Sequence, residues 1–247
     1  MANYLIISGT SAIGRETAQQ LVAEGHHVFL TGRNLEKIQE LSEQLRASYG
    51  LLDATDFEQT ERIFLEAKEK LGSLEGVVNC AGSLLLKPAH LTTKDEYEAV
   101  IAANLTTSFA IVRAAGKVMA ESGGSIVLIS SAAALEGLAN HEAIASSKAA
   151  LTGLILSAAA TYAPSHLRFN AVAPGLVETS LTQHLTETSS ARKVSEAMHP
   201  LGRIGSPRDI AAGIVFFLKP ENDWVTGQVL AIDGGLSRIK PRLKVSL

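Results

Sequence analysis

The stretch Ile7-Ser8-Gly9-Thr10-Ser11-Ala12-Ile13-Gly14 decides the fold, because it joins an apolar strand-like segment to an amphipathic helix-like segment. Small residues at such a junction let backbone N–H groups and the helix N-terminus approach a pyrophosphate. Gly9 and Gly14 are two such small residues, and Ser8 and Ala12 are small residues in place of further glycines. A structural turn from strand to helix uses the same residue types. The turn alone therefore leaves a nucleotide site and a purely structural role both open.

The next apolar segment adds a prediction about the cofactor. It ends in Leu30-Thr31-Gly32-Arg33-Asn34, at about the distance from the turn where an NAD site places an acid for the ribose 2′-hydroxyl. No acid occurs here, and Arg33 is able to pair with a 2′-phosphate. The sequence thus predicts NADP(H) rather than NAD, with an ordinary exposed arginine as the alternative. Asp53 is a candidate contact for the adenine amino group, or else a helix-capping residue ahead of Phe57.

Strand-like and helix-like segments alternate from one end of the chain to the other. The expected strands are Tyr4–Ile7, His27–Leu30, Leu51–Leu52, Gly76–Val78, Ser125–Ile129, Arg168–Val172 and Gln228–Ile232. The expected helices include Glu16–Glu24, with Gly25 as its C-terminal cap, Leu35–Ala47, Phe57–Lys70, Leu105–Glu121 and Ala145–Tyr162. This alternation predicts an α/β fold with a Rossmann-type, doubly wound parallel sheet, in one domain over residues 1–247.

Composition limits the class of protein. Hydrophobic residues make up 46% of the chain and aromatic residues 5%, so the core must be built from Ala, Val, Ile and Leu. The net charge of −3 gives the whole protein no attraction to nucleic acid or to an anionic membrane. The apolar runs are shorter than the roughly 18 residues of a membrane span, and no signal peptide is evident, so we expect a cytoplasmic protein. Cys80 is the only cysteine, which excludes an intrachain disulfide and a thiolate metal cluster, and we expect no metal site.

Two segments fall outside the alternation. Residues 179–199 are polar and rich in Ser and Thr, and they follow a predicted strand, so this segment is a candidate lid over a site. His184 and His199 within it are expected to be surface residues. Residues 238–247 carry Arg238, Lys240, Arg242 and Lys244 with no acid, which is typical of a solvated basic tail, with an anionic partner as the alternative.

With these residues identified, the chain resembles the short-chain dehydrogenase/reductase family over nearly its whole length. The segment Asn79-Cys80-Ala81-Gly82 is similar to the family's Asn-Asn-Ala-Gly, and Asn104, Ser131 and Lys148 match its active-site Asn, Ser and Lys. The remaining matches are Ile129-Ser130-Ser131, Pro174-Gly175 with Thr179, Pro200-Leu201-Gly202-Arg203, Thr226-Gly227-Gln228 and Asp233-Gly234-Gly235.

The resemblance implies hydride transfer between nicotinamide C4 and a carbonyl or carbinol carbon of a small molecule. The serine would hold the substrate oxygen, the lysine would bind the nicotinamide ribose, and the asparagine would order a water relay. The implied cofactor contacts are Ser8, Gly9, Thr10, Ser11, Ile13, Gly14, Arg33, Asp53, Asn79, Ala81, Gly82, Lys148, Pro174, Gly175 and Thr179.

The resemblance also implies a homotetramer, or a dimer, built on the helices that follow Asn104 and contain Lys148. Small residues of the second helix would permit the close approach of a partner, or would pack on the chain's own sheet. They are Ala149, Ala150, Gly153, Ser157 and Ala158.

The chain departs from the family at the residue that should donate the proton. The family pattern is Tyr-x-x-x-Lys, but this chain reads Ile144-Ala145-Ser146-Ser147-Lys148. Ile144 has no ionisable proton, and a carbonyl reduction needs a donor within hydrogen-bond reach of the oxygen. His141 is the nearest substitute, because an imidazole titrates near neutrality and would share a helix face with Ile144 if the helix began early enough. A partly exposed loop histidine is the alternative.

Two hypotheses about function therefore remain. The first is an NADP(H)-dependent oxidoreductase with an altered proton relay that uses Ser131, Lys148, Asn104 and His141. The second is a non-catalytic relative that binds a dinucleotide as a sensor or as a partner subunit. The three retained active-site matches favour the first hypothesis, and the missing tyrosine favours the second.

Overall fold

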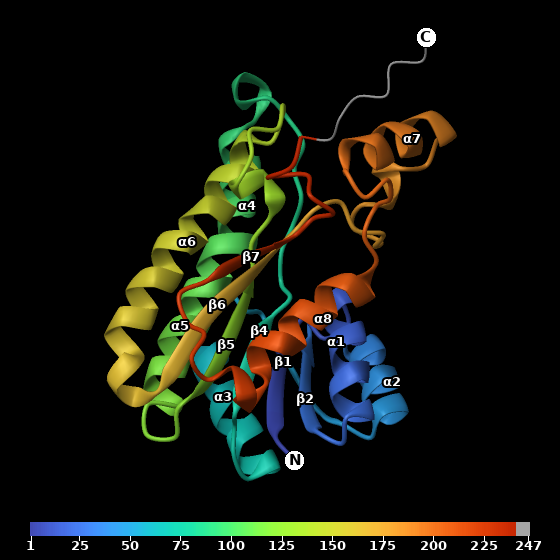
Figure 1. Ribbon diagram of the computed structural model, residues 1–247. Helices are drawn as coiled ribbons and strands as arrows, with labels where there is room; N and C mark the ends of the chain where they lie inside the picture. Colours follow the sequence, from blue (N-terminus) through green and yellow to red (C-terminus); the bar gives the residue numbers. More distant parts are fainter. Residues whose placement is uncertain (241–247) are drawn as a thin grey trace.

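The computed structural model describes residues 1–240 and contains one parallel sheet of seven strands in the order β3-β2-β1-β4-β5-β6-β7 (Figure 1). The strands are β1 Asn3–Ile7, β2 His27–Gly32, β3 Ser48–Leu51, β4 Gly76–Asn79, β5 Gly124–Ile129, β6 Leu167–Pro174 and β7 Val229–Ile232. This order confirms the predicted doubly wound fold. It reverses between β1 and β4, and ligands of such sheets bind at the carboxyl edge beside that reversal.

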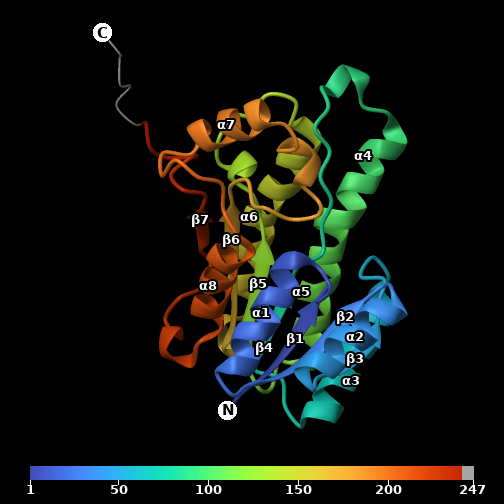
Figure 2. The same ribbon diagram turned by 90° about the vertical axis from the view of Figure 1, so that its right-hand side faces the viewer.

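Helices cover both faces of the sheet (Figures 1 and 2). One face carries α1 Ala12–Ala23, α2 Leu35–Leu45 and α8 Pro207–Leu218; the other carries α3 Phe57–Leu71, α5 Thr107–Val118 and α6 Glu142–Tyr162. Because the five inner strands β2, β1, β4, β5 and β6 are buried on both sides, their residues are apolar almost without interruption, and the two cores are aliphatic as the composition predicts.

The third strand was predicted at Leu51–Leu52 but occupies Ser48–Leu51. Its first residues, Ser48, Tyr49 and Gly50, lack the apolar run that marks the other strands. A Cβ at Gly50 would lie 2.7 Å from Ile63 Cδ1 and 3.2 Å from the Phe29 ring, so a larger residue there would need these side chains to shift. The prediction missed the strand's start because contacts from α3, rather than β-propensity, select these residues.

Helix starts also differ from the prediction. Helix α1 begins at Ala12 rather than Glu16, and α6 begins at Glu142 rather than Ala145. The expected helix Leu105–Glu121 is the end of a longer helical run formed by α4 Lys94–Ile101, a π-helical turn Ala102–Thr106, and α5. The capping residue of α3 is Asp56, whose carboxylate accepts from Gln59 N–H at 2.8 Å, so the alternative reading of Asp53 as the cap is wrong.

Among the described residues, α7 and α8 were not predicted, and neither was α4. Helix α8 has a sequence signal, the capping box formed by Ser206 and Asp209 with Pro207 in its first turn. Helix α7, Ser189–Met198, lies within the candidate lid. In Figure 1 it stands beyond the carboxyl edge of the sheet, away from both helical layers. Residues 241–247, most of the predicted basic tail, lie outside the described residues.

Two helical stretches, Lys94–Val118 and Glu142–Ser165, are long and apolar enough to cross a membrane by length and composition alone. In their most apolar windows 50% and 44% of the residues are buried inside the chain. Many of their apolar residues, such as Ile111, Leu151 and Ile155, belong to the core between α3, α5, α6 and the sheet. Core helices of this kind have the same composition as membrane spans, so the stretches are explained by packing within the fold.

Candidate active site at the carboxyl edge of the sheet

The glycine-rich turn between β1 and α1 is closed tightly at the carboxyl edge of the sheet. Ser11 caps the helix, because its hydroxyl oxygen accepts from Gly14 N–H at 3.1 Å. A Cβ at Gly14 would lie 2.5 Å from Ser8 O and 3.0 Å from Gly9 Cα, so no larger residue fits. The first turn of α1 therefore presents its free N–H groups to the edge, where an anion would be stabilised.

Arg33 lies exposed just beyond the end of β2, close to this turn. Within residues 1–240 no carboxylate lies within ion-pair distance of its guanidinium, which leaves the group available to a ligand. Asp53 is also exposed. Hydrogen bonds from the Thr55 hydroxyl and backbone hold the pKa of Asp53 below its usual value, and the charge of Arg33 adds to this.

The segment after β4 is positioned by two buried amides. Asn79 accepts from Ala81 N–H at 3.0 Å and donates to the Ser108 hydroxyl at 3.1 Å. Asn104, fully buried in the π-helical turn, donates to Ser83 Oγ at 3.1 Å and to the Val100 carbonyl at 2.9 Å. The two side chains therefore shape the Cys80–Ser83 segment, and such π-helical turns occur frequently at functional sites.

Lys148 and Ser131 meet at the end of β5. Lys148, on α6, is 6% exposed and donates from Nζ to the Ile129 carbonyl at 2.6 Å. Burial lowers its pKa to about 8, so the ammonium remains mostly charged at neutral pH. The Ser131 oxygen accepts from Ala133 N–H at 3.1 Å, which leaves its hydroxyl proton for a ligand. A Cβ at Gly82 would lie 3.0 Å from Asn104 Oδ1 and 3.6 Å from Lys148 Nζ.

Eight of the eighteen predicted site residues line one cavity of about 260 Å³, which we call the Lys148 cavity. Its walls come from the first turn of α1, the segment after β4, the end of β5, α6 and the loop after β6. They include Ser11, Ile13, Ala81, Gly82, Asn104, Ser131, Lys148 and Thr179. The structure thus brings together residues that lie far apart in sequence, whereas Ser8, Gly9, Thr10, Gly14, Arg33, Asp53 and Asn79 lie outside this lining.

A second cavity, of about 440 Å³, lies beneath α7; we call it the lid cavity. Ser131, Ile144, Leu84 and Thr182 line both cavities, so the two are adjacent. Pro174 and Gly175 at the end of β6 also line the lid cavity.

His141 and Ile144 both line the lid cavity beside Ser131. His141 directly precedes α6, and its Nδ1 lies 2.8 Å from the Ala139 carbonyl. A carbonyl oxygen can only accept, so Nδ1 carries a proton and Nε2 faces no described hydrogen-bond partner. Ile144 is 3% exposed and packs with Val100 and the leucines of the segment after β4. At this end of α6, His141 rather than Ile144 therefore brings a polar ring to the lid cavity.

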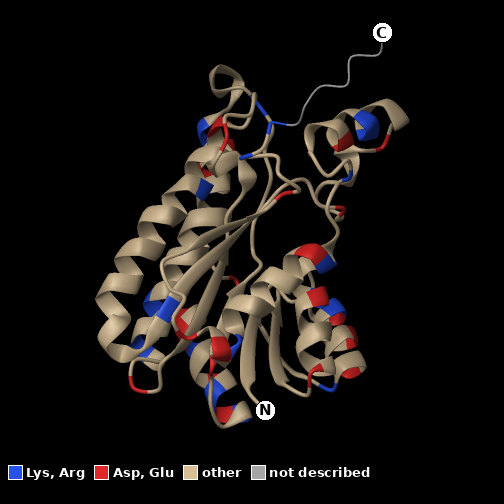
Figure 3. Cartoon of the chain, in the orientation of Figure 1, with Lys and Arg blue, Asp and Glu red and all other residues tan. Residues whose placement is uncertain are grey.

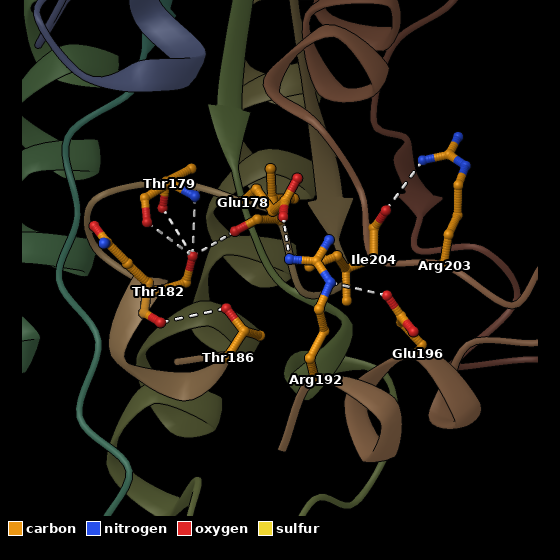
Figure 4. A network of polar contacts seen from close by, with 10 residues as sticks. Glu178, Thr179, Thr182, Thr186, Arg192, Glu196, Arg203 and Ile204 are labelled. Carbon is orange, nitrogen blue, oxygen red and sulfur yellow. Dashed lines mark hydrogen bonds and ion pairs between the residues drawn. The ribbon is translucent and has the colours of Figure 1, made fainter. Parts of the chain in front are cut away.

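The lid is closed at its base. Val177 pairs with Gly205 in an isolated parallel bridge, and Glu178 N–H donates to the Gly205 carbonyl at 2.9 Å. On α7, Arg192 pairs with Glu178 at 2.6 Å and with Glu196 at 3.0 Å (Figure 4). The bridge thus holds together the two ends of the lid segment, and the Arg192–Glu178 ion pair fixes α7 to its N-terminal end.

His199, at the end of the lid, is buried and 4% exposed, so its expected surface position is wrong. Its Nδ1 donates to the Ser195 carbonyl at 2.7 Å, and its Nε2 accepts from Leu176 N–H at 3.2 Å. The imidazole therefore ties α7 to the loop after β6. Sequence reasoning missed this role because the fold, rather than any local pattern, brings Leu176 to His199. His184 is exposed, as predicted.

Comparison with known proteins identifies the family. The family described as enoyl-(acyl carrier protein) reductase, one of the short-chain dehydrogenase/reductase type, matches residues 7–237. The chain belongs to the short-chain dehydrogenase/reductase family. Carbonyl reductase family member 4 of Danio rerio is 33% identical to this short-chain dehydrogenase/reductase over 239 residues, covering 94% of this chain and 96% of the relative. The 3-oxoacyl-[acyl-carrier-protein] reductase of Mus musculus is 32% identical, with the same coverage.

Solved structures agree with this assignment. A short-chain dehydrogenase/reductase from Mycobacterium ulcerans superposes with a TM-score of 0.91 at 31% identity, covering 96% of this chain and 90% of that one. ElxO with NADP bound gives a TM-score of 0.89 at 32% identity, with coverages of 95% and 98%. This short-chain dehydrogenase/reductase therefore shares the Rossmann fold of oxidoreductases, some of which have been solved with NADP.

Proposed function

We propose that this protein is an NADP(H)-dependent oxidoreductase that acts on a carbonyl or secondary alcohol carbon with a proton relay lacking the tyrosine. One observation carries the proposal: Ser131, Lys148 and Asn104 converge on the Lys148 cavity, which adjoins a second cavity containing His141. The site thus combines a buried cation, a free hydroxyl and an imidazole beside an apolar space. Such groups can stabilise the negative charge that develops on a carbonyl oxygen during reduction.

The chain fits the cofactor. The tight turn at Gly14 would let the N-terminus of α1 bind a pyrophosphate. Arg33, whose guanidinium has no ion-pair partner within residues 1–240, would supply a cation for a 2′-phosphate. Gly82 keeps open a space bounded by Asn104 and Lys148 that a Cβ would fill. The remaining proposed cofactor contacts are Asp53, Asn79, Ala81, Pro174, Gly175 and Thr179. When bound, NADPH supplies the hydride.

Ser131 and Lys148 would stabilise negative charge on the substrate oxygen. The Ser131 hydroxyl proton is free to donate, because the oxygen of that hydroxyl already accepts from Ala133 N–H. The Lys148 ammonium, held against the Ile129 carbonyl, adds positive charge in a site of low dielectric.

His141 would replace the tyrosine as acid or base. With Nδ1 held as a donor by the Ala139 carbonyl, neutral His141 presents a lone pair at Nε2 and can accept the proton of an alcohol. Protonated His141 presents N–H at the same atom and can donate to a carbonyl oxygen. The neutral imidazole would therefore serve the oxidation direction, and the protonated imidazole the reduction direction.

Turnover of activated ketones and quinones with NADPH tests the proposal. We expect weak turnover, because a positioned acid typically contributes about 10²–10⁴-fold. Ser131→Ala and Lys148→Met should lower it, and His141→Ala should lower it and flatten the pH profile near neutrality. Ile144→Tyr should raise the rate by restoring the family's donor, provided the substrate still fits beside the ring. Turnover unaffected by Ser131→Ala would place the reaction elsewhere.

The second hypothesis, a non-catalytic dinucleotide-binding subunit, is favoured by one specific observation: Ile144 is buried among apolar side chains where the family has its proton donor. It predicts NADPH binding without turnover in both the wild type and Ile144→Tyr across the same carbonyl panel. Binding measured by calorimetry alongside the activity assay separates the two hypotheses.

We also propose a homotetramer built on α5 and α6. Ala149, Ala150, Gly153 and Ser157 form an exposed strip of small residues on α6 that would admit a partner helix, whereas Ala158 packs in the chain's own core. Light scattering at micromolar concentration should report a tetramer or dimer, and a monomer would refute the assembly.

A further inference from the structure

We propose that the substrate carries its carbonyl on an uncharged, apolar body that lies in the lid cavity beneath α7. The inference rests on the proposed function, because Ser131, which lines both cavities, is taken as the group that holds the carbonyl oxygen.

No acidic, lysine or arginine side chain is among the described residues that line the lid cavity. In Figure 3 the charged residues gather mainly on the outer helices. The walls are aliphatic: Leu84 and Leu86 come from the segment after β4, and Leu138 and Ile144 from the region around the start of α6. A carboxylate or phosphate in this space would lose its hydration without gaining an ionic partner, which is strongly unfavourable. The cavity therefore selects against charged substrates.

The lid supplies an apolar wall whose large side chains are still exposed. Ala191, Val194, Ser195 and Met198 recur at helical spacing along α7 and line the cavity. Val194 is 62% exposed and Met198 48% exposed. Arg192 lies outside that lining, and its ion pair with Glu178 (Figure 4) connects α7 to the loop after β6. An apolar ligand would cover the exposed wall and gain from its burial.

Polar atoms available to a ligand are few in the lid cavity. Both ring nitrogens of His199 are already bonded, and the Thr182 hydroxyl donates to the Val177 carbonyl. Ser131 and His141 retain free hydrogen-bonding capacity, and the Ser195 hydroxyl adds one further group. This set matches a ligand with one reactive oxygen and an otherwise apolar body.

Two probes that share one oxo chain and differ in the charge of its far end test the inference: the methyl ester of 9-oxodecanoic acid and the free 9-oxodecanoate anion. With NADPH, kcat/KM should be at least about tenfold higher for the ester, mainly through KM. Val194→Lys should lower the value for the ester and raise it for the anion, because it places a cation in the exposed wall. Ala197→Lys adds the same charge to an exposed position of α7 outside the lining and should change neither value.

Binding to the NADPH-loaded protein, measured by calorimetry, separates this inference from the proposed function. Tighter binding of the ester with no turnover of either probe would retain the inference and refute the catalytic function. Equal or better turnover of the anion would overturn the inference while the oxidoreductase function stands. Failure of both probes to bind, or a loss of ester binding in Ala197→Lys equal to that in Val194→Lys, would also overturn it.

Discussion

Arg33 is the residue on which cofactor choice depends, because its guanidinium has no ionic partner in residues 1–240. Removing a charge-assisted contact to a 2′-phosphate should cost about 1.5–3 kcal/mol, or roughly ten- to a hundredfold in Kd. Titration of NADPH and NADH should show tighter binding of NADPH to the wild type, and Arg33→Ala should remove the difference. Arg33→Lys keeps the charge but not the planar guanidinium, so its preference for NADPH over NADH should lie between those of the wild type and Arg33→Ala. Equal affinity of the wild type for the two cofactors would refute this assignment.

Ser8 and Ala12 are both small substitutes in the glycine-rich turn, but their backbones differ. Ser8 has φ +56, a conformation that is unfavourable for residues with a Cβ, whereas Ala12 opens α1. Ser8→Gly should raise the free energy of unfolding by about 0.5–1 kcal/mol, and Ala12→Gly should lower it by up to about 1 kcal/mol. Urea denaturation of both variants checks the opposite signs. A loss of stability in Ser8→Gly would contradict the argument.

At the scale of elements, the Arg192–Glu178 ion pair joins α7 to the loop after β6, and the Arg192–Glu196 pair lies within α7. They are partly exposed, with side-chain exposures of 43% for Arg192 and 50% for Glu178, so each contributes at most about 1 kcal/mol and is screened by salt. Arg192→Gln should raise KM for an apolar ketone about two- to fivefold with little change in kcat. Added salt should raise the wild-type KM and leave that of the variant unchanged.

Lys193→Gln is the matched control, since it removes the same charge from the next residue of α7. It should behave like the wild type. If the two variants had equal effects, general electrostatics rather than the Arg192 pairs would be responsible.

The sequence predicted most elements because each carries its own signal, such as the apolar runs of β1 and β5 or the glycine after α1. The prediction failed at positions where contacts between residues far apart in the sequence determine the local structure. Gly50 in β3 is set by Ile63, and the burial of His199 is set by its bond to Leu176. In the site, the motif residues were found by resemblance. The walls of the lid cavity carry no motif, because any apolar residue of suitable size can line such a space.

At the scale of the whole molecule, Lys148 and Cys80 should make stability depend on pH above neutrality. Burial lowers the pKa of Lys148 from 10.5 to about 8, so between these values the unfolded chain binds more protons and stability rises with pH. Burial raises the pKa of Cys80 from 9.0 to about 12, so stability falls with pH above about 9. The wild type should gain up to about 1.4 kcal/mol from pH 8 to 9 and then level off.

Guanidinium unfolding at several pH values tests this balance. Lys148→Met should abolish the rise between pH 8 and 9. Cys80→Ala should extend the rise toward pH 10.5, because the opposing titration is removed. A wild-type rise that persists in Lys148→Met would show that another group is responsible.

The bridge between Val177 and Gly205 has a consequence for how this chain can change. Because the two strands of backbone meet there, the residues between them form an excursion that leaves the sheet and returns to the same point. Apart from residues 179–182, which line the Lys148 cavity, its length and composition can vary without moving β6, β7 or the groups around Lys148. The residues after Thr182 therefore affect which substrate binds without belonging to the site around Lys148. A segment from another reductase that replaces residues 183–204 should transfer substrate preference as a self-contained unit.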